Sequence, residues 1–409
     1  MSRQIDLALQ SHGLPRLQRS SWVEVDIEVL TTNALSLAAM VSPAALAPVV
    51  KADGYGHGLE IAARCAVAAG SEWLCVADSA EAIQLRADGY RGRVLVLYPV
   101  PSSMWLEMAD TGVDLTVGGV EEARAMARSV VTDRPLGVHV EIDTGMTRGG
   151  VRVDEVVDAA GALTSGPGVE LAGVWTHLSA PEDQEVTKSQ LDHFAVGLDS
   201  LETAGIEPGV VHAAASGGLL ASDTSWHDLV RPGLAFYGLH PDAGDPLPSS
   251  VAPALSVRAQ PVRVLEVPSG TRVGYAGTWT AENRSVIATL PIGYADGWSR
   301  SSSPGTFAIV KGRRAPIVGR ISSDSLTVDI TGIQGAGPAS EFTLLGRDGA
   351  EIITADEVAA VRGTISWEVL QQLGARLSRV YTVGSEPIAL RPESSVEIMV
   401  GEGASVPHY

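Results

Sequence analysis

Reactive side chains follow several short apolar stretches of this chain. The stretch "VVKADGYGHG" (residues 49–58) leads two valines into Lys51 and then into a glycine-rich loop that contains Tyr55. Later apolar stretches are followed by further polar residues, namely Glu141, Asp143, Arg148, His177, His212, Ser216 and Arg231. Taken singly, each has an ordinary explanation, such as a solvated charge or a hydrogen-bonded structural histidine. An amine, imidazoles and guanidinium groups act together only if the fold brings them to one place.

The elements between about residues 45 and 240 alternate regularly. Apolar runs recur eight times, in "APVVKAD", "WLCVADS", "RVLVLYP", "DLTVGG", "LGVHVEIDT", "LAGVWTHLS", "GVVHAAAS" and "LVRPGLAFYG". Stretches with the helical spacing of alanine and leucine lie between them. Strands that are apolar on both faces are typical of parallel sheets covered by helices. Eight such units predict an α/β fold, a (β/α)8 TIM-type barrel, and a doubly wound sheet is the alternative.

A barrel would gather the polar residues at the C-terminal ends of its strands, where barrel chemistry lies. Barrels also tend to bind phosphate after the seventh and eighth strands, where Ser216-Gly217-Gly218 and Pro232-Gly233-Leu234 stand. These residues offer a hydroxyl and backbone N–H groups to an anion. Lys51, after the first strand, would face them. An amine that faces a phosphate cradle favours pyridoxal 5′-phosphate (PLP), held as a Schiff base.

The hydrophobic pattern of the sequence changes near residue 250. A Pro/Ser-rich joint, "GDPLPSSVAP", is followed by alternating strands and glycine-rich turns, which predict a mainly antiparallel β domain. One helix is expected over 354–374, with Thr354 as its N-cap. The strand "SWVEVDIEVL" (21–30) has no barrel partner and is expected to cross to the second domain. The expected organisation is an N-terminal tail (1–20), a PLP-binding barrel (21–245), a β-rich C-terminal domain (246–390) and a C-terminal tail (391–409).

Composition narrows the classes of partner. The formal net charge is −19, which argues against nucleic acid or an anionic membrane as the main partner, since both require a basic face. Cys65 and Cys75 lack metal-ligand or redox spacing, so we expect buried free thiols in a reducing cytoplasm and no metal site. We expect no signal peptide and no membrane span, because no stretch is long and apolar enough.

At these residues the chain resembles the alanine racemase family, which are PLP enzymes with a barrel and a β-rich C-terminal domain. The resemblance runs from about Trp22 to Tyr381 and is carried, in order, by "VVKADGYGHG", "IDTGMTRGG", "RPGLAFYG", "PIGYADGW" and "GTISWEVL". "WTHLSAPED" and "VGYAGTW" are weaker motifs that fall where the family has them. As a set, these motifs are highly specific.

The resemblance implies a role for individual residues. Lys51 would bind the cofactor and act as one of two bases, and Tyr275 would be the opposing base, supplied by the other subunit of a head-to-tail homodimer. His177 would hydrogen-bond that tyrosine, and Arg231 would face the pyridine nitrogen with His212 behind it. The phosphate would be held by Tyr55, Ser216, Gly233 and Leu234. The substrate side would be formed by Arg148, Tyr294, Arg300, Arg320, Ser323 and Asp324.

The chemistry of racemisation favours a site with two bases. Racemisation removes a proton from one face of a planar intermediate and returns one to the other face, which a single base does not easily do. A guanidinium stays protonated, so a pyridine nitrogen facing Arg231 would stay unprotonated, which makes the ring a weaker electron sink.

The chain departs from the family pattern around the site. Glu141 stands where many members have a carbamylated lysine, and we expect its carboxylate to hold Arg148 by charge-assisted hydrogen bonds. At four other places this chain has a residue that differs from the usual one of the family. It has Asp53-Gly54 where the family has Asn-Ala, Ala215 where it has asparagine, Ser322-Ser323 where it has Cys-Met, and Ala375 where it often has a tyrosine.

The function implied is interconversion of L- and D-alanine for cell-wall precursors. Ser322-Ser323 leaves open a racemase of broader or different specificity, acting on serine or basic amino acids. A PLP decarboxylase or aldolase is a rival that has no need of Tyr275 as a second base. A non-catalytic PLP-binding protein would have little reason to keep Lys51, Arg148, His177, Arg231 and Tyr275.

Overall fold

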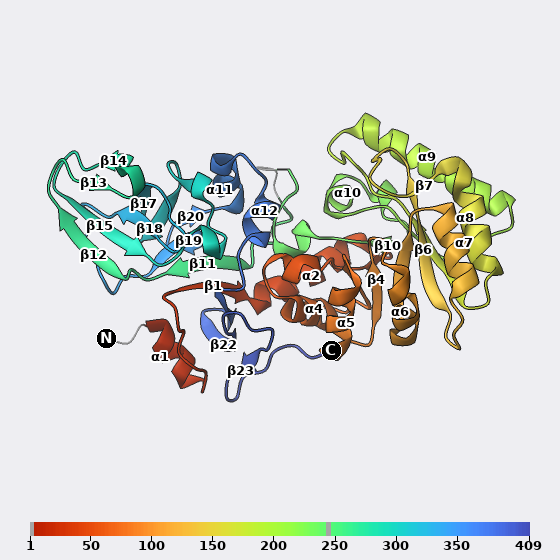
Figure 1. Cartoon of the computed structure of the whole chain (residues 1–409), viewed down its shortest axis with the longest axis horizontal. Coiled ribbons are helices and arrows are strands. Elements are labelled where there is room, and N and C mark those ends of the chain that lie inside the picture. The colour runs from red at the N-terminus through yellow and green to blue at the C-terminus, as the bar shows by residue number, and fades with distance from the viewer. Residues whose placement is uncertain (1–3, 243–246) are drawn as a thin grey trace. The chain divides into compact units, whose positions relative to one another are not determined.

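The computed structural model describes residues 4–242 and 247–409, which divide into two compact units (Figure 1). The barrel unit holds the described residues of Leu30–Gly54, Leu59–Ala252 and Pro407–Tyr409. The sheet unit holds the described residues up to Val29, together with Tyr55–Gly58 and Pro253–Val406. The domain boundary predicted between residues 245 and 246 lies outside the described residues.

Within the described residues, the barrel unit contains eight parallel strands that close into a ring. They are β2 (Ala45–Leu46), β3 (Trp73–Val76), β4 (Arg93–Val96), β5 (Val113–Val117), β6 (Leu136–Asp143), β8 (Val169–Trp175), β9 (Val210–His212) and β10 (Leu229–Val230). Strands β3 to β9 pair in chain order, and β7 (Val151–Arg152) pairs with β6. The ring closes because β10 pairs with β2, Val49 bridges Cys75, and Ala215 bridges Arg231. The predicted (β/α)8 barrel is therefore confirmed, and the doubly wound alternative is wrong.

The barrel strands are buried on both faces, as their sequences predict. In β3, for example, the consecutive residues Leu74, Cys75 and Val76 are all fully buried. Side chains of alternate residues point into the ring or toward the surrounding helices, so both sets need to be apolar. The helices of this unit are α2 (Ile27–Val41), α4 (Leu59–Ala68), α5 (Ser79–Ala87), α6 (Trp105–Thr111), α7 (Val120–Ser129), α8 (Val156–Ser165), α9 (Gln184–Thr203) and α10 (Ser216–Ala221).

The sheet unit is mainly antiparallel. Its main sheet has the order β12-β15-β18-β17-β16-β19-β11-β1-β21-β22-β23, with β20 beside β19, and β13 and β14 form a separate hairpin. The strands are β1 (Ser21–Asp26), β11 (Leu255–Ala259), β12 (Arg263–Val267), β13 (Arg272–Val273), β14 (Trp279–Thr280), β15 (Ser285–Leu290), β16 (Phe307–Val310), β17 (Arg313–Val318), β18 (Leu326–Asp329), β19 (Phe342–Asp348), β20 (Glu351–Ile353), β21 (Ser378–Val383), β22 (Glu386–Arg391) and β23 (Met399–Val400).

Strand β1 lies inside this sheet. It pairs antiparallel with β11 and parallel with β21, and its Trp22, Val23 and Val25 are fully buried. The strand that lacked a barrel partner therefore belongs to the sheet of the C-terminal half. Helix α1 (Gln4–Ser11) precedes it and packs its Ile5 and Leu9 in the same core cluster as Trp22.

The single helix expected over 354–374 is two helices, α11 (Ala355–Arg362) and α12 (Ser366–Gln371). Thr354 is the N-cap, as predicted, since its Oγ1 accepts a hydrogen bond from the Glu357 N–H at 3.1 Å. Gly363 ends the first helix with φ +69°, a left-handed conformation that glycine adopts without strain. The helical periodicity continues across this glycine, which is why the sequence did not reveal the break.

Other expectations concern the end of the chain and its thiols. Residues assigned to a C-terminal tail include β23, which pairs with β22, and Tyr409, whose ring lies 5.5 Å from that of Tyr90. Cys65 and Cys75 are free and buried, as predicted. No helix in the described part of the chain has the length and apolarity needed to cross a membrane.

Candidate active site

Lys51 opens a turn with left-handed backbone geometry. The φ angles of Ala52, Asp53 and Tyr55 are 53°, 54° and 52°. This conformation costs a non-glycine residue roughly 1–2 kcal/mol, so surrounding contacts must hold it. The Ala52 N–H donates to Glu81 Oε1 at 2.6 Å, which fastens the turn at its start. Strained backbone of this kind concentrates at functional sites.

Two glycines after the turn allow the chain to pass close to other groups. A Cβ on Gly56 (φ +86°) would lie 2.5 Å from the Leu370 carbonyl oxygen. A Cβ on Gly58 (φ +108°) would lie 2.4 Å from the Tyr381 hydroxyl oxygen. Both positions therefore require glycine for space as well as for conformation.

The Lys51 amine lies among positive charges. Its Nζ is 5.7 Å from the centre of the Tyr98 ring, and the Arg148 guanidinium is 5.3 Å from the same ring. Burial lowers the pKa of Lys51, and the charge of Arg148 lowers it further. The amine is therefore neutral more often than a solvated lysine, as a nucleophile or base must be.

Arg231 is a buried cation without a carboxylate partner among the described residues. Its NH1 group bonds His212 Nδ1 at 2.5 Å, and NH2 donates to the carbonyls of Thr176 and Ala213 at 3.0 and 3.1 Å. Burial lowers its pKa to about 10. Of the five N–H groups of a guanidinium, two have no hydrogen-bond partner in the described part of the chain. Arg231 can therefore still donate to an acceptor that enters the site.

A chain of buried side chains extends from Arg231 through the barrel. Since arginine only donates, His212 Nδ1 must accept, and its Nε2–H then donates to His139 Nδ1 at 2.9 Å. His139 Nε2 must carry the other proton, and it faces Asp114 Oδ2 at 3.7 Å. Burial raises the pKa of Asp114, but His139 and Arg93 outweigh it and the pKa is lowered. Burial holds the pKa of His212 well below its usual value, so this imidazole is neutral. Arg231 at one end of the chain of side chains and Asp114 at the other fix the tautomers of both histidines.

Three of the predicted phosphate residues, Ser216, Gly233 and Leu234, meet at the ends of β9 and β10. Ser216 Oγ accepts hydrogen bonds from the backbone N–H groups of Gly233 at 3.0 Å and Ala235 at 3.1 Å. Its hydroxyl hydrogen is then free to point to an anion. Leu234 begins a 3-10 turn directly after Gly233. The N-cap of α10 is Ala215, which makes no side-chain capping bond.

His177 follows β8 at the same end of the barrel. Its carbonyl accepts a hydrogen bond from Gln190 Nε2 at 3.2 Å, which fixes the loop. Burial, and then the charges of Arg231, Arg148 and Lys51, together lower the pKa of His177 to about 3. The imidazole is therefore neutral. Lys51, Arg148 and Arg231 therefore lie close enough to His177 for their charges to act on it.

The expected contact between Glu141 and Arg148 is not found. No ion pair or hydrogen bond joins them in the described part of the chain, although Glu141 is buried. Burial raises the pKa of Glu141, while the nearby charge of Arg148 lowers it, and the net shift is upward. The loop after β6 explains the separation, because Asp143 Oδ1 accepts from the Thr147 N–H at 2.9 Å and the turn directs Arg148 toward Tyr98.

The remaining predicted residues lie in the sheet unit. Tyr275 follows β13 in the hairpin loop and is 69% exposed, and Tyr294 is 51% exposed. Asp324 is exposed and accepts from Arg376 NH2 at 2.7 Å. Ser323 precedes it. Tyr55 is buried.

Several contributing residues escaped the sequence reasoning, namely Glu81, Tyr98, Asp114 and His139. His139 lies two residues before Glu141 on a strand whose inward positions were already marked as reactive, which was an available signal. Asp78 and Glu81 have the spacing of a capping pair, and Asp78 Oδ1 accepts from the Glu81 N–H. That pattern predicts the start of α5 but not the bond of Glu81 to Ala52.

Comparisons with known proteins identify the family of this chain. The family model "Alanine racemase, N-terminal domain" matches residues 25–241, and "Alanine racemase, C-terminal domain" matches residues 254–381. The chain is 34% identical over 386 residues to the alanine racemase of Desulfosudis oleivorans, covering 91% of this chain and 99% of that protein. It is 35% identical over 369 residues to that of Symbiobacterium thermophilum, with 89% and 97% covered. The solved structure of alanine racemase from Bacillus anthracis with bound L-Ala-P has a TM-score of 0.85 and 32% identity, covering 94% of this chain and 98% of that one.

Proposed function

The chain belongs to the alanine racemase family, and from that membership we propose which of its groups hold PLP and move the proton. It is a PLP-dependent isomerase that interconverts L- and D-alanine. The site residues fit this cofactor. Arg231 is a buried cation with two unpartnered N–H groups, which suits the pyridine nitrogen, an acceptor. Lys51 would bind the aldehyde carbon, and Tyr55, Ser216, Gly233 and Leu234 would hold the phosphate.

Bound PLP supplies the electron withdrawal that acidifies the Cα–H of the amino acid. The neutral Lys51 amine would take or return a proton on one face of Cα. The Tyr275 hydroxyl would act on the opposite face, with His177 as its hydrogen-bond partner. Arg148 would orient the substrate carboxylate, and Tyr294, Ser323 and Asp324 would border the substrate. The observation that carries this assignment is the position of the Lys51 amine after the first barrel strand, where its Nζ and the Arg148 guanidinium face the same Tyr98 ring.

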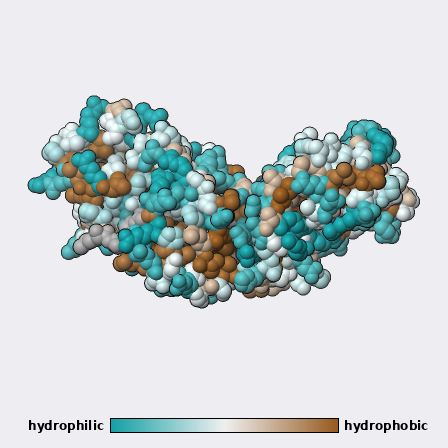
Figure 2. Space-filling model, turned by 60° about the horizontal axis from the view of Figure 1, so that its bottom comes forward, coloured by the Kyte–Doolittle hydropathy of each residue, from teal (hydrophilic) through white to brown (hydrophobic). Residues whose placement is uncertain are grey.

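A homodimer would complete the site. Tyr275 is a proposed base, yet it lies exposed in a hairpin loop of the sheet unit. Val262, Leu265 and Ile365 are further exposed apolar residues of that unit. Figure 2 shows separate hydrophobic patches on a largely hydrophilic face. We infer that a second copy of the chain covers part of this surface and receives Tyr275 at its barrel.

Borohydride reduction tests the cofactor lysine. The purified protein is reduced, digested and mapped, and the pyridoxyl group is expected on Lys51. A pyridoxyl group on another lysine would refute the site. A chiral assay of L- and D-alanine, with serine and lysine as competitors, measures the breadth of specificity. Alanine turnover with no detectable serine turnover is expected.

A further inference from the structure

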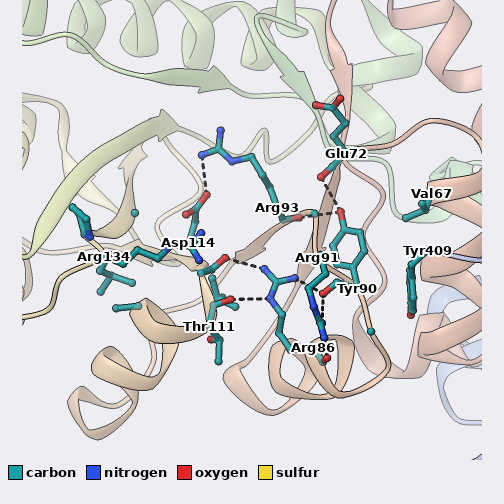
Figure 3. A pocket seen from close by; sticks show the side chains of 18 of the residues that line it. Val67, Glu72, Arg86, Tyr90, Arg91, Arg93, Thr111, Asp114, Arg134 and Tyr409 are labelled. Carbon is teal, nitrogen blue, oxygen red and sulfur yellow. Dashed lines mark hydrogen bonds and ion pairs between the residues drawn. The ribbon is translucent and has the colours of Figure 1, made fainter.

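A second pocket lies at the other end of the barrel from the candidate active site. It has a volume of about 770 Å³ and is lined by the first residues of three strands, Arg93 of β4, Val113 of β5 and Leu136 of β6 (Figure 3). Tyr90 and Tyr409 form an aromatic wall. Pockets of this volume accommodate metabolites.

Four arginines line this pocket, namely Arg86, Arg91, Arg93 and Arg134. Arg93 is paired with Asp114, with NH2 and Oδ2 3.1 Å apart. The other three form no ion pair in the part of the chain that the structure describes. A Cβ on Gly112 would lie 2.4 Å from the Arg134 guanidinium, so that side chain lies against the α6–β5 turn.

The hydrogen bonds of the three arginines without an ion pair leave N–H groups free to bind a ligand. Arg86 donates to the carbonyls of Thr111, Tyr90 and Gly112 at 2.9, 3.1 and 2.8 Å, which fixes its guanidinium while leaving its charge uncompensated. Arg91 donates to two carbonyls through NH1 alone, so its Nε and NH2 groups stay available. Arg134 has no hydrogen bond within the described residues.

The positive charges repel one another. Burial is the largest cause of the lowered pKa of Arg86. Tyr90 and Asp114 raise this pKa, the neighbouring charges of Arg91 and Arg134 lower it, and the net shift is downward. Glu72 and Glu170 also line the pocket, but neither forms an ion pair with these arginines within the described residues. In Figure 3 the Glu72 carboxylate points away from Arg86. Unpaired like charges in one pocket are unusual in a chain of net charge −19, and an anion would relieve the repulsion.

We propose that this pocket binds a small metabolite with two or more phosphate or carboxylate groups, held by Arg86, Arg91 and Arg134. The fixed guanidinium of Arg86 would form the floor of the site, and the two exposed arginines, Arg91 and Arg134, would bind the ligand from the solvent side. Arginine suits oxyanions of both kinds because its N–H groups form a planar fork. The Arg93–Asp114 pair would remain in place, since Asp114 is also held by His139.

Calorimetric titration of the holoenzyme tests the proposal, with pyrophosphate and citrate as probes at constant ionic strength. Saturable binding of at least one probe is expected, and which probe binds distinguishes phosphate from carboxylate ligands. Each of R91A and R134A should weaken it roughly tenfold or more, the effect of losing a charge-assisted hydrogen bond. The matched control is R128A, an exposed arginine of α7 outside the pocket, which should bind as the unchanged protein does.

Hydrogen exchange locates the binding. With probe added, amides of residues 86–93 and 111–114 should exchange more slowly, and those near Ser216 and Gly233 should not change. Absence of saturable binding by both probes would overturn the proposal. So would binding that survives the R91A/R134A double variant unchanged, because it would then belong to another site.

Discussion

Glu141 is a buried carboxylate that influences Arg148 through space rather than by contact. E141Q keeps the shape and removes the charge. We expect turnover to fall by roughly tenfold or less, the scale of one unpaired electrostatic interaction in a partly wet site, with PLP retained. Steady-state kinetics and the PLP content of the variant measure this. Wild-type turnover in E141Q, or stimulation of the unchanged enzyme by bicarbonate, would contradict a role for this carboxylate in place of a carbamylated lysine.

His139 joins His212 to Asp114 in the barrel interior. H139F keeps a ring of similar size but leaves the His212 Nε2–H without an acceptor. An unsatisfied buried donor costs about 1–3 kcal/mol, so the free energy of unfolding should fall by that amount. Urea unfolding measures it. The control H408F, an exposed histidine that forms no hydrogen bond within the described residues, should change the free energy of unfolding by less than about 0.5 kcal/mol.

At this scale the sequence predicted the residues that end strands and missed those that bridge them. Lys51, His177 and Arg231 were predicted because the barrel rule assigns strand ends to the site, and their role remains a prediction. His139 and Asp114 matter through hydrogen bonds between neighbouring strands, and the register that pairs two strands is not readable from one sequence. The same limit explains the error on Glu141 and Arg148, since the direction of Arg148 depends on the turn that Asp143 caps.

Gly56, after the Lys51 turn, and Gly70, after α4, have similar backbone conformations but different surroundings. Gly56 and Gly70 have nearly equal φ angles of +86° and +88°, but a Cβ on Gly56 would meet the Leu370 carbonyl, while one on Gly70 meets nothing within 4 Å. Alanine at either position adopts a left-handed conformation at similar cost. G56A should therefore be less stable than G70A by about 1–3 kcal/mol, the cost of overpacking. Urea unfolding of both variants tests this, and equal stabilities would contradict it.

Helices and strands were predicted correctly where a regular hydrophobic pattern has clear boundaries in the sequence. Seven of the eight predicted apolar runs overlap their barrel strand, because each is separated from the next by a helical stretch. The first run, 47–53, begins directly after β2 (Ala45–Leu46) and contains Val49, which bridges Cys75. The division of 354–374 into two helices was missed, because a single Gly363 inside a helical pattern is compatible with a continuous helix. The closure of the ring rests on short pairings around Val49 and Ala215, which carry no sequence signal of their own.

The stability of the whole molecule should respond to one raised pKa in the sheet unit. Burial, and then the charge of Glu24, raises the pKa of Glu341 to about 7. Its protonated form therefore contributes stability that is fully present below the unfolded-state pKa and is lost as pH rises through about 7. E341Q should remove this dependence and be more stable at pH 8. The gain should be about 1 kcal/mol or less, since the side chain is 38% exposed and water screens it.

Urea unfolding at pH 5 and pH 8 compares the two proteins. The difference between E341Q and the unchanged enzyme should be larger at pH 8 than at pH 5. The exposed Glu386 supplies the control E386Q, which should show the same pH dependence as the unchanged enzyme. A difference that does not vary with pH would contradict the assignment to Glu341.

Shared sites would be visible in mixtures of variants. K51A and Y275F should each lose most activity, by roughly 100-fold or more, because each removes a proposed base. If Tyr275 serves the barrel of the partner, a heterodimer of the two variants contains one intact site. Co-refolded mixtures should therefore regain up to about a quarter of wild-type activity by random pairing. No recovery, or full activity in a monomer by light scattering, would contradict the proposed dimer.

Strand β1 is synthesised long before the two strands with which it pairs. The ribosome releases this strand first, yet its neighbours β11 and β21 follow only after the whole barrel sequence. This apolar segment therefore has no pairing partner while residues 27–254 are translated. Exposed strand edges favour aggregation during that time. A gene fragment that starts at residue 253 would encode a sheet with a gap between β11 and β21. Expression of the C-terminal half alone should give insoluble protein, and supplying residues 1–29 as a separate peptide should recover part of it.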